Sequence, residues 1–362
     1  MKTFRLIFAV VVGLLPTPLW AVDGPTCATA ACHSDLMKKP ELHAPMKATG
    51  GCAVCHQTGT ELPPKAKPDH PKLKPITRSE TNDLCYVCHD AFPEQLKKRK
   101  HAHGAIEKDS CLGCHDPHGS KHAKLLTMKL APELCLSCHE ATAQESRMVG
   151  SHHGDVIIQG ESCMRCHTSH AADHKQLLKS APEKQCVECH SKAIETKDHR
   201  TLKSVTDEIK GAAVKHKPVA NGKCTECHVS HGSAHQALLN DRYTPEYYPK
   251  QVNAADFAFC YKCHKQENIT KSNVREETAF RNGSDNLHQL HVLDPDKPRS
   301  CRICHEAHVS QNHALITDGY VVRGVRVPLR FTKTPGGGKC ATACHGTKEY
   351  SRLERIVNAP GP

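Results

Sequence analysis

The spacing of the cysteines constrains this chain more than any other feature. All 22 cysteines of the 362 residues fall into eleven pairs, and a histidine directly follows the second cysteine of every pair. Nine pairs have the strict form C-x-x-C-H: Cys52 with Cys55, Cys85 with Cys88, Cys111 with Cys114, Cys135 with Cys138, Cys163 with Cys166, Cys186 with Cys189, Cys224 with Cys227, Cys260 with Cys263, and Cys301 with Cys304. The two outermost pairs, Cys27 with Cys32 and Cys340 with Cys344, have longer spacers. No cysteine is left over, so one chemistry has to account for all of them.

C-x-x-C-H is the attachment signature of c-type haem, in which both sulfurs bond to the porphyrin and the adjacent histidine ligates the iron. Three other chemistries compete with this interpretation. A disulfide framework explains neither the fixed spacing nor the histidines. Zinc fingers do not usually place a histidine directly after the second cysteine, and redox C-x-x-C motifs normally occur singly. Eleven repetitions therefore predict eleven covalently bound haems.

The histidines divide into expected proximal and distal iron ligands. The proximal ligands follow the cysteine pairs: His33, His56, His89, His115, His139, His167, His190, His228, His264, His305 and His345. Few methionines are present, so we expect histidine as the second axial ligand. The distal candidates are His43, His70, His103, His118, His153, His170, His216, His231, His291 and His308, with His122, His174, His235 and His313 as alternates. We expect His101, His152, His199 and His288 to be exposed or hydrogen bonded, although one further histidine has to serve the first haem.

The distal candidates recur at regular places in an internal repeat. An upstream histidine precedes the first cysteine pair of each repeat by eight to ten residues. A near downstream histidine comes three residues after the first proximal ligand, and a far one comes seven or eight after it. We favour the near one, which can face a neighbouring haem but not the far side of its own. His70 is expected to replace it in the first repeat.

The repeat predicts a domain organisation of two-haem modules. An N-terminal haem segment covers residues 22–42 and a degenerate first module covers 43–100. Modules two to five cover residues 101–150, 151–215, 216–287 and 288–362. The first 21 residues are expected to be a signal peptide, with Lys2 and Arg5 before an apolar stretch and a small-residue cleavage site at Ala21. That stretch is too short for a transmembrane helix, so we expect an exported protein with no membrane-spanning helix of its own.

Composition sets the fold class. Hydrophobic residues make up 38% of the chain and aromatic residues only 4%, which is too little for an ordinary side-chain core. We therefore predict a mostly irregular multihaem cytochrome c, an extended repeat of modules around a stack of haems, with short α-helical turns carrying each motif and very little β-structure. A small β-hairpin is expected at residues 320–331. The net charge of +11 is offset by haem propionates in this interpretation, so it implies no nucleic-acid partner.

The modules resemble a known family. The segments "CLGCHDPHGS", "CTECHVSHGS" and "APELCLSCHE" are similar to doubled C-x-x-C-H cytochromes. Haem density and the upstream histidines resemble the periplasmic decahaem cytochromes of porin–cytochrome conduits. That resemblance implies electron transport between the periplasm and the outer membrane or extracellular partners. The implied partners are redox proteins, an outer-membrane β-barrel porin and an extracellular cytochrome.

Three function classes remain open at this point. The first is an electron-transfer protein without bond chemistry and without catalytic residues. The second is a multihaem oxidoreductase for nitrogen or sulfur oxyanions, which requires one haem with an open axial position. The third is a subunit of an extracellular cytochrome filament. Every motif ends in histidine, which favours the first class.

Overall fold

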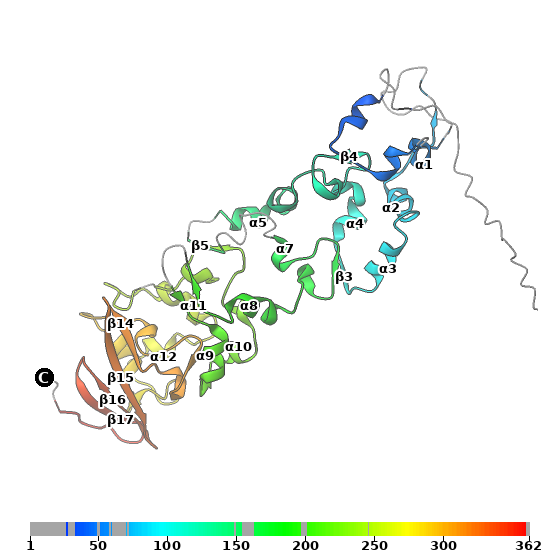
Figure 1. Cartoon of the computed structure of the whole chain (residues 1–362). Coiled ribbons are helices and arrows are strands. Elements are labelled where there is room, and N and C mark those ends of the chain that lie inside the picture. The colour runs from blue at the N-terminus through cyan, green and yellow to red at the C-terminus, as the bar shows by residue number, and fades with distance from the viewer. Residues whose placement is uncertain are drawn as a thin grey trace, which may run out of the picture. The chain divides into compact units, whose positions relative to one another are not determined.

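The structure is a computed structural model that describes residues 27, 33–48, 51–57, 59, 70, 72–147, 150–153, 163–196, 201–244 and 246–359. The expected signal peptide, Cys32 and His199 lie outside these residues. The chain divides into two compact units (Figure 1). The first comprises Met1–Gln95 and Gly104–Lys129, and the second comprises Leu96–His103 and Leu130–Pro362.

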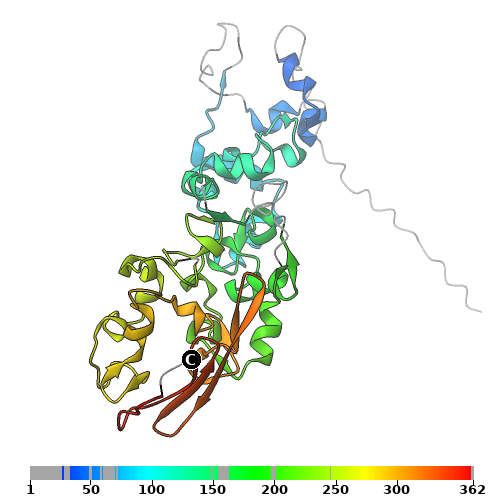
Figure 2. The same cartoon turned by 90° about the vertical axis from the view of Figure 1, so that its left-hand side faces the viewer.

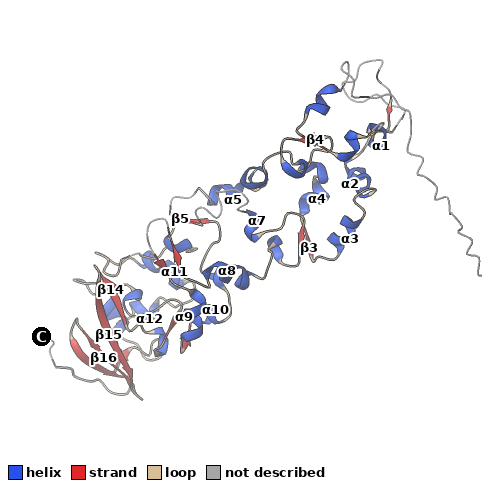
Figure 3. Ribbon diagram, viewed as in Figure 1, coloured by secondary structure: helices blue, strands red, loops and turns tan. Residues whose placement is uncertain are grey.

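The helices are short throughout (Figure 3). The α-helices are α1 (Cys52–Cys55), α2 (Arg78–Tyr86), α3 (Ala91–Lys97), α4 (Gly104–Lys108), α5 (Glu140–Glu145), α7 (Cys163–Cys166), α8 (Pro182–His190), α9 (Val205–Gly211), α10 (Lys217–Ala220), α11 (Ala258–Tyr261), α12 (Glu267–Thr270) and α13 (Leu287–Val292). The remaining helical turns are of other types. One is the π-helical turn η5 (Leu130–Leu134). The others are the 3₁₀-helices η1 (Ser34–Lys38), η2 (Ala44–Lys47), η3 (Cys111–Gly113), η4 (Ala123–Leu125), η6 (Lys175–Leu177), η7 (Cys224–Glu226), η8 (Gln236–Leu238), η9 (Ala254–Phe257), η10 (Cys301–Ile303) and η11 (His313–Leu315).

Local sequence explains where the two nine-residue helices begin. Thr77 caps α2, because its hydroxyl accepts from the Glu80 N–H at 3.3 Å while the Glu80 carboxylate accepts from the Thr77 N–H at 3.0 Å. This is the reciprocal capping box, and its hydrogen bonds hold the pKa of Glu80 below its usual value. Pro182 occupies the first turn of α8, where its missing N–H costs nothing.

Most strands are two residues long and form separate antiparallel pairs. These pairs are β1 (Glu41–Leu42) with β4 (Gly119–Ser120), β3 (His101–Ala102) with β6 (Ala171–Ala172), β5 (Ser151–His152) with β10 (Gly232–Ser233), β7 (Ile194–Glu195) with β8 (Thr201–Leu202), β9 (Val214–Lys215) with β13 (Val309–Ser310), and β11 (Arg281–Asn282) with β12 (Asp285–Asn286). Four of them join segments that are about 70 to 100 residues apart in the sequence, so they connect separate modules, or the N-terminal segment and a module, rather than neighbouring loops.

A four-stranded antiparallel sheet is the exception. It runs in the order β14 (Gly319–Val322), β15 (Val325–Lys333), β16 (Gly337–Thr342) and β17 (Gly346–Ser351), and Figure 2 shows its strands. The β14–β15 hairpin turns at Arg323 and Gly324, which both have positive φ, as the two-residue turn that matches strand twist requires. The expected hairpin region is thus part of a larger sheet that also contains the last cysteine pair.

Buried apolar side chains are few in both units. Leu126 is the one buried hydrophobic residue in the described part of the first unit. The main cluster of the second unit consists of Tyr243, Phe257 and Val292, with Cys260 and Cys301 packed against it. This outcome agrees with the predicted fold class of short helices and little β-structure, which is confirmed. Within the described residues, no helix combines the length and the apolar character that crossing a membrane requires.

Candidate functional site

Each strict motif is wound into a single helical turn. In eight of the nine, the histidine N–H donates to the carbonyl of the first cysteine at 2.8 to 3.1 Å. The ninth, at Cys186, lies inside α8. Residues spaced three and four apart share one face of a helix, so the turn places both sulfurs and the imidazole on the same side. That is the arrangement needed to bond one porphyrin twice and ligate its iron.

The two stretched motifs differ from this pattern. Across the longer first spacer, the His33 N–H still donates to the Cys27 carbonyl at 3.2 Å. Cys340 lies on strand β16, where it faces Phe331 on one neighbouring strand and Lys348 on the other. The expectation that a helical turn carries every motif is therefore wrong for the last one, because pairing in the sheet holds its backbone extended.

Ten of the proximal candidates face a second histidine, with ring centroids 5.9 to 6.4 Å apart. The pairs are His33 with His70, His56 with His118, His89 with His43, His139 with His103, His167 with His231, His190 with His153, His228 with His308, His264 with His216, His305 with His288, and His345 with His291.

These separations fit a metal ion between each pair of rings. A histidine nitrogen binds a transition metal at about 2 Å, so two imidazoles on opposite sides of one ion have centroids roughly 6 Å apart. In three pairs the ring planes are also nearly parallel: 8° for His43 and His89, 15° for His56 and His118, and 11° for His103 and His139. The donor set is an imidazole on each side, which suits haem iron.

Backbone carbonyls orient the proximal rings of modules two to five. The Nδ1 atoms of His115, His167, His228 and His305 lie 2.9, 2.7, 2.8 and 2.9 Å from the carbonyl oxygens of Lys124, Gln176, Ala237 and Ala314. When Nδ1–H donates to a carbonyl, the tautomer is fixed and Nε2 is left for the metal. These are the hydrogen bonds typical of metal-bound histidine.

The residues that supply these carbonyls have an unusual backbone. Lys124, Gln176, Ala237 and Ala314 have φ of 53° to 59°, and the leucine after each one has φ of 55° to 59°. Left-handed backbone costs a non-glycine residue about 1–2 kcal/mol. The left-handed backbone recurs at the same place in four modules, and in each one it directs a carbonyl toward the proximal histidine ring. We therefore associate this backbone conformation with the hydrogen bond to that ring.

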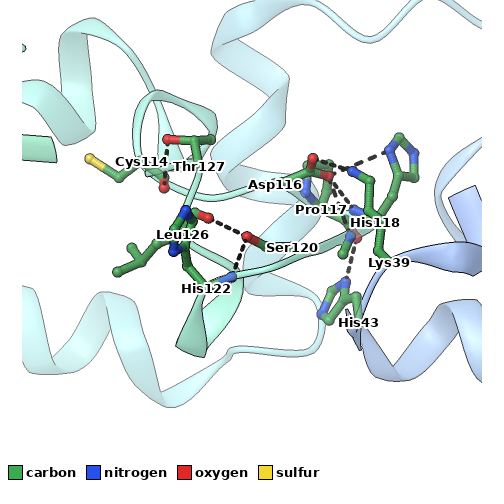
Figure 4. Close-up of polar contacts among 11 residues, drawn as sticks. Lys39, His43, Cys114, Asp116, Pro117, His118, Ser120, His122, Leu126 and Thr127 are labelled. Atoms are coloured by element: carbon green, nitrogen blue, oxygen red, sulfur yellow. Dashed lines mark hydrogen bonds and ion pairs between the residues drawn. The ribbon is translucent and has the colours of Figure 1, made fainter. Parts of the chain in front are cut away.

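The upstream histidines are held in the same way by the following module. The Nδ1 atoms of His43, His153 and His216 lie 2.9, 2.6 and 3.1 Å from the carbonyls of Pro117, Ser230 and Ala307. Their backbone N–H groups donate to the carbonyls of His118, His231 and His308. Figure 4 shows the first of these sites, with His43, Pro117 and His118 close together. Each upstream ring is thus placed by the residues that surround a near downstream histidine.

The pairing has a simple rule. An upstream histidine faces the second proximal histidine of its own module, as His216 faces His264. A near downstream histidine instead faces the first proximal histidine of the preceding module, as His231 faces His167 and His308 faces His228. The short ladders β5–β10 and β9–β13 lie immediately beside these residues and hold separate modules together.

Burial favours the neutral imidazole that a metal requires. Loss of hydration lowers the pKa of His118, His167, His190, His291, His305 and His308. Burial also lowers the pKa of His288, to about 4. A metal ligand has to be deprotonated at the coordinating nitrogen, so these sites need no proton removal near neutral pH.

The structure gives two histidines other partners than the sequence predicted. His288, expected to be exposed or hydrogen bonded, lies in α13 and faces His305, while its Nδ1 is 3.0 Å from the Thr278 hydroxyl. His70, expected to serve the first module, faces His33 of the N-terminal segment instead. No spacing rule in the sequence identified either histidine, because His288 comes seventeen residues before His305 and His70 comes thirty-seven residues after His33.

The four alternate distal candidates lie beside the left-handed turns and do not face a proximal histidine in the ring pairs described above. His122, His174 and His235 precede the turns η4, η6 and η8, and His313 is the first residue of η11. In these turns the left-handed residues supply carbonyls to the proximal rings. Among the ring pairs described above, none includes an alternate. His101 lies in β3 and is half-buried, and the side chain of His152 lies outside the described atoms.

Cysteines of consecutive motifs lie against each other. The side chains of Cys85 and Cys111, Cys186 and Cys224, and Cys260 and Cys301 lie close enough to interact. Burial is the main cause that raises the pKa of Cys85 and Cys186 to about 11, with the neighbouring thiol adding to it. Electrostatic interactions also link Cys55 to Cys88, Cys166 to Cys189, Cys227 to Cys263, and Cys304 to Cys340. Neighbours in sequence are therefore neighbours in space at these motifs.

Known proteins share this organisation. A family model for the doubled CXXCH motif matches residues 43–94, 103–144, 155–195 and 216–269, which together exceed half of the chain. Multiheme cytochrome MtrA of Shewanella baltica is 26% identical over 256 residues, or 64% of this chain and 67% of that protein. High-molecular-weight cytochrome c of Nitratidesulfovibrio vulgaris is 25% identical over 304 residues, which is 80% of this chain but only 46% of that protein. The repeated cysteine pairs, the facing histidines and this match place the chain in the doubled CXXCH family, as a multihaem c-type cytochrome of electron transport.

Proposed function

We propose that the chain holds eleven bis-histidine haems and relays single electrons along them without catalysing bond chemistry. The observation that carries this proposal is the set of facing histidine pairs, with centroids 5.9 to 6.4 Å apart. When bound, each haem supplies an iron that exchanges one electron, and two histidines leave it no open position for a substrate.

We further propose that electrons pass through the haems in the order of their motifs along the sequence. The contacts between cysteines of consecutive motifs support this order, because each sulfur is bonded to the edge of its porphyrin. Because the sulfurs of Cys260 and Cys301 lie close enough to interact, the edges of the two porphyrins bonded to them would also lie close together. The motifs at Cys27 and Cys340 are then the two ends of the relay.

The proposed setting is the periplasm or the outer membrane. The expected signal peptide and the similarity to MtrA support export and a place among conduit cytochromes. The partners would be redox proteins at the two ends, with an outer-membrane porin and an extracellular cytochrome as the implied neighbours. Co-purification of an outer-membrane porin with the native protein tests this assignment, and a filament seen by particle imaging of the secreted fraction would replace it.

The haem count and spin state test the central proposal. A pyridine haemochrome assay combined with the intact mass of the mature protein should give eleven haems per chain. The ferric and ferrous spectra should be low-spin and unchanged by carbon monoxide, cyanide or nitrite. A haem that binds any of these ligands in the wild-type protein would contradict the relay and favour an oxidoreductase with one open site.

A further inference from the structure

We propose that Glu145 lowers the reduction potential of the haem attached at Cys163 and Cys166 by hydrogen bonding to its distal histidine, His231. This inference rests on the proposed function, because it takes His167 and His231 as the two axial ligands. Glu145 thus acts as a positioning residue through His231 and does not itself touch the haem iron.

The contact joins two modules. Glu145 is the last residue of α5, and its Oε2 lies 3.1 Å from Nδ1 of His231, which belongs to the next but one module along the chain. The ring of His231 lies 6.3 Å from the ring of His167, with the planes 28° apart. Nδ1 therefore donates to the carboxylate, and Nε2 is left to face the iron. Both side chains are partly exposed, at 35% for His231 and 41% for Glu145.

The comparable histidines His118 and His308 have no described hydrogen bond of this kind. Asp116 lies beyond hydrogen-bond distance of His118, at 3.8 Å from its Nδ1, and is engaged by Lys39 and by the backbone N–H groups of His118 and Gly119 (Figure 4). The ring of His308 makes no described hydrogen bond to a carboxylate, although the charges of Glu208 and Glu306 act on it by tending to raise its pKa.

The proximal hydrogen bonds of the Cys163 haem and the Cys224 haem are the same in kind. His167 donates to the Gln176 carbonyl at 2.7 Å, and His228 donates to the Ala237 carbonyl at 2.8 Å. The Cys163 and Cys224 haems therefore have equivalent proximal hydrogen bonds. The difference between them lies in the distal contact of Glu145 with His231.

A carboxylate changes the electron density of the ligand. Its negative charge polarises the Nδ1–H bond and makes the imidazole a stronger donor to the metal. A stronger donor and a nearby negative charge both stabilise ferric iron relative to ferrous iron, so the reduction potential falls. Partial exposure of both side chains weakens the effect but does not change its sign.

The test is a spectroelectrochemical titration of the full-length, haem-loaded protein. In Glu145→Gln the amide can still accept the hydrogen bond but carries no charge. We expect about one eleventh of the haem absorbance to titrate at a higher potential than in the wild type. The expected change is roughly three- to tenfold in that haem's redox equilibrium constant, or about 30 to 59 mV for a one-electron couple. Glu145→Ala should shift the same fraction in the same direction.

The matched control is Glu354→Gln, which removes the same charge from an exposed glutamate of the C-terminal segment and should leave the titration unchanged. A Glu145→Gln titration identical to the wild type, with eleven low-spin haems present, overturns the inference and leaves the relay standing. An equal shift in Glu354→Gln overturns it as well, because the effect would then be a general response to charge. A wild type with fewer low-spin haems would instead contradict the proposed function. If Glu145→Gln does not incorporate its haems, the titration of Glu145→Ala tests the inference in its place, with the same expected shift and the same contradicting result.

Discussion

At the scale of single residues, spacing after the proximal histidine decides which histidine can reach another haem. His231 lies three residues after His228 and directly precedes β10, whose pairing with β5 ties it to the preceding module. His235 lies seven residues after His228, at the start of the turn η8, whose Ala237 carbonyl orients His228. The near histidine therefore completes the neighbouring module, whereas the far one belongs to its own loop.

Replacing these two histidines should have different results. His231→Ala removes the distal ligand opposite His167, so we expect one haem per chain to become high-spin and to bind carbon monoxide. His235→Ala is the control and should keep every haem low-spin. Carbon monoxide difference spectra and electron paramagnetic resonance measure both outcomes. An open haem in His235→Ala, with His231→Ala unchanged, would reverse the assignment.

His288 gives a second test at this scale, because it is the histidine that sequence reasoning set aside. It faces His305 at 6.3 Å, so His288→Ala should open the haem attached at Cys301 and Cys304. His313→Ala, which alters the alternate candidate in the same module, should not. Binding of carbon monoxide by one haem in His288→Ala but none in His313→Ala is the expected measurement. Low-spin spectra in both variants would remove His288 from the ligand set.

At the scale of elements, the left-handed turn after each first motif is the most specific local structure. Gln176 and Leu177 both have positive φ, and the Gln176 carbonyl points at His167. Serine hydroxyls fix the same loop in three modules. Ser233, for example, donates to the Leu239 carbonyl at 2.5 Å and accepts from the His235 N–H at 2.9 Å. The loop is thus held in a strained conformation by its own hydrogen bonds.

Substitutions at Gln176 should separate strain from side-chain chemistry. Glycine adopts positive φ without penalty, so Gln176→Gly should match or slightly exceed the wild type in stability. A β-branched residue is disfavoured there more strongly than glutamine, so Gln176→Val should lower the free energy of unfolding, by roughly 1 kcal/mol. Urea unfolding followed at the haem absorbance band measures both variants. Equal midpoints for valine and glycine would show that the turn carries no strain.

At the scale of the whole molecule, the polypeptide has too little apolar interior to fold alone. Leu126 is the single buried hydrophobic residue described in the first unit, and the largest cluster in the second contains three residues. Burial of apolar area is the dominant favourable term in folding, at about 25 cal/mol per Å². The porphyrins have to supply most of that area in both units.

Loss of haem should therefore unfold the protein. Chain produced without covalent haem attachment is expected to show weak far-ultraviolet circular dichroism, an expanded hydrodynamic radius and rapid proteolysis. The haem-loaded chain should be compact and resistant under the same conditions. A compact, protease-resistant chain without haem would mean that side chains alone build the core.

The sequence by itself determined the chemistry. The cysteine pairs and their adjacent histidines identify haem c, because thioether attachment and proximal ligation are local and lie within five to seven residues of the chain. The scarcity of aromatic residues and the abundance of Pro, Gly and Lys likewise predicted short helices and little regular sheet. These are properties of short segments and of composition, so they do not depend on how distant parts of the chain meet.

Only the tertiary structure decided which histidines face each other. The partner of His167 is 64 residues away and the partner of His228 is 80 residues away, and the two-residue ladders that hold them are too short to leave a pattern in the sequence. The same is true of His288, whose contact with His305 follows no spacing that recurs in the other modules. Ligation across modules is a contact between distant segments, and its energy depends on packing that no local pattern of residues specifies.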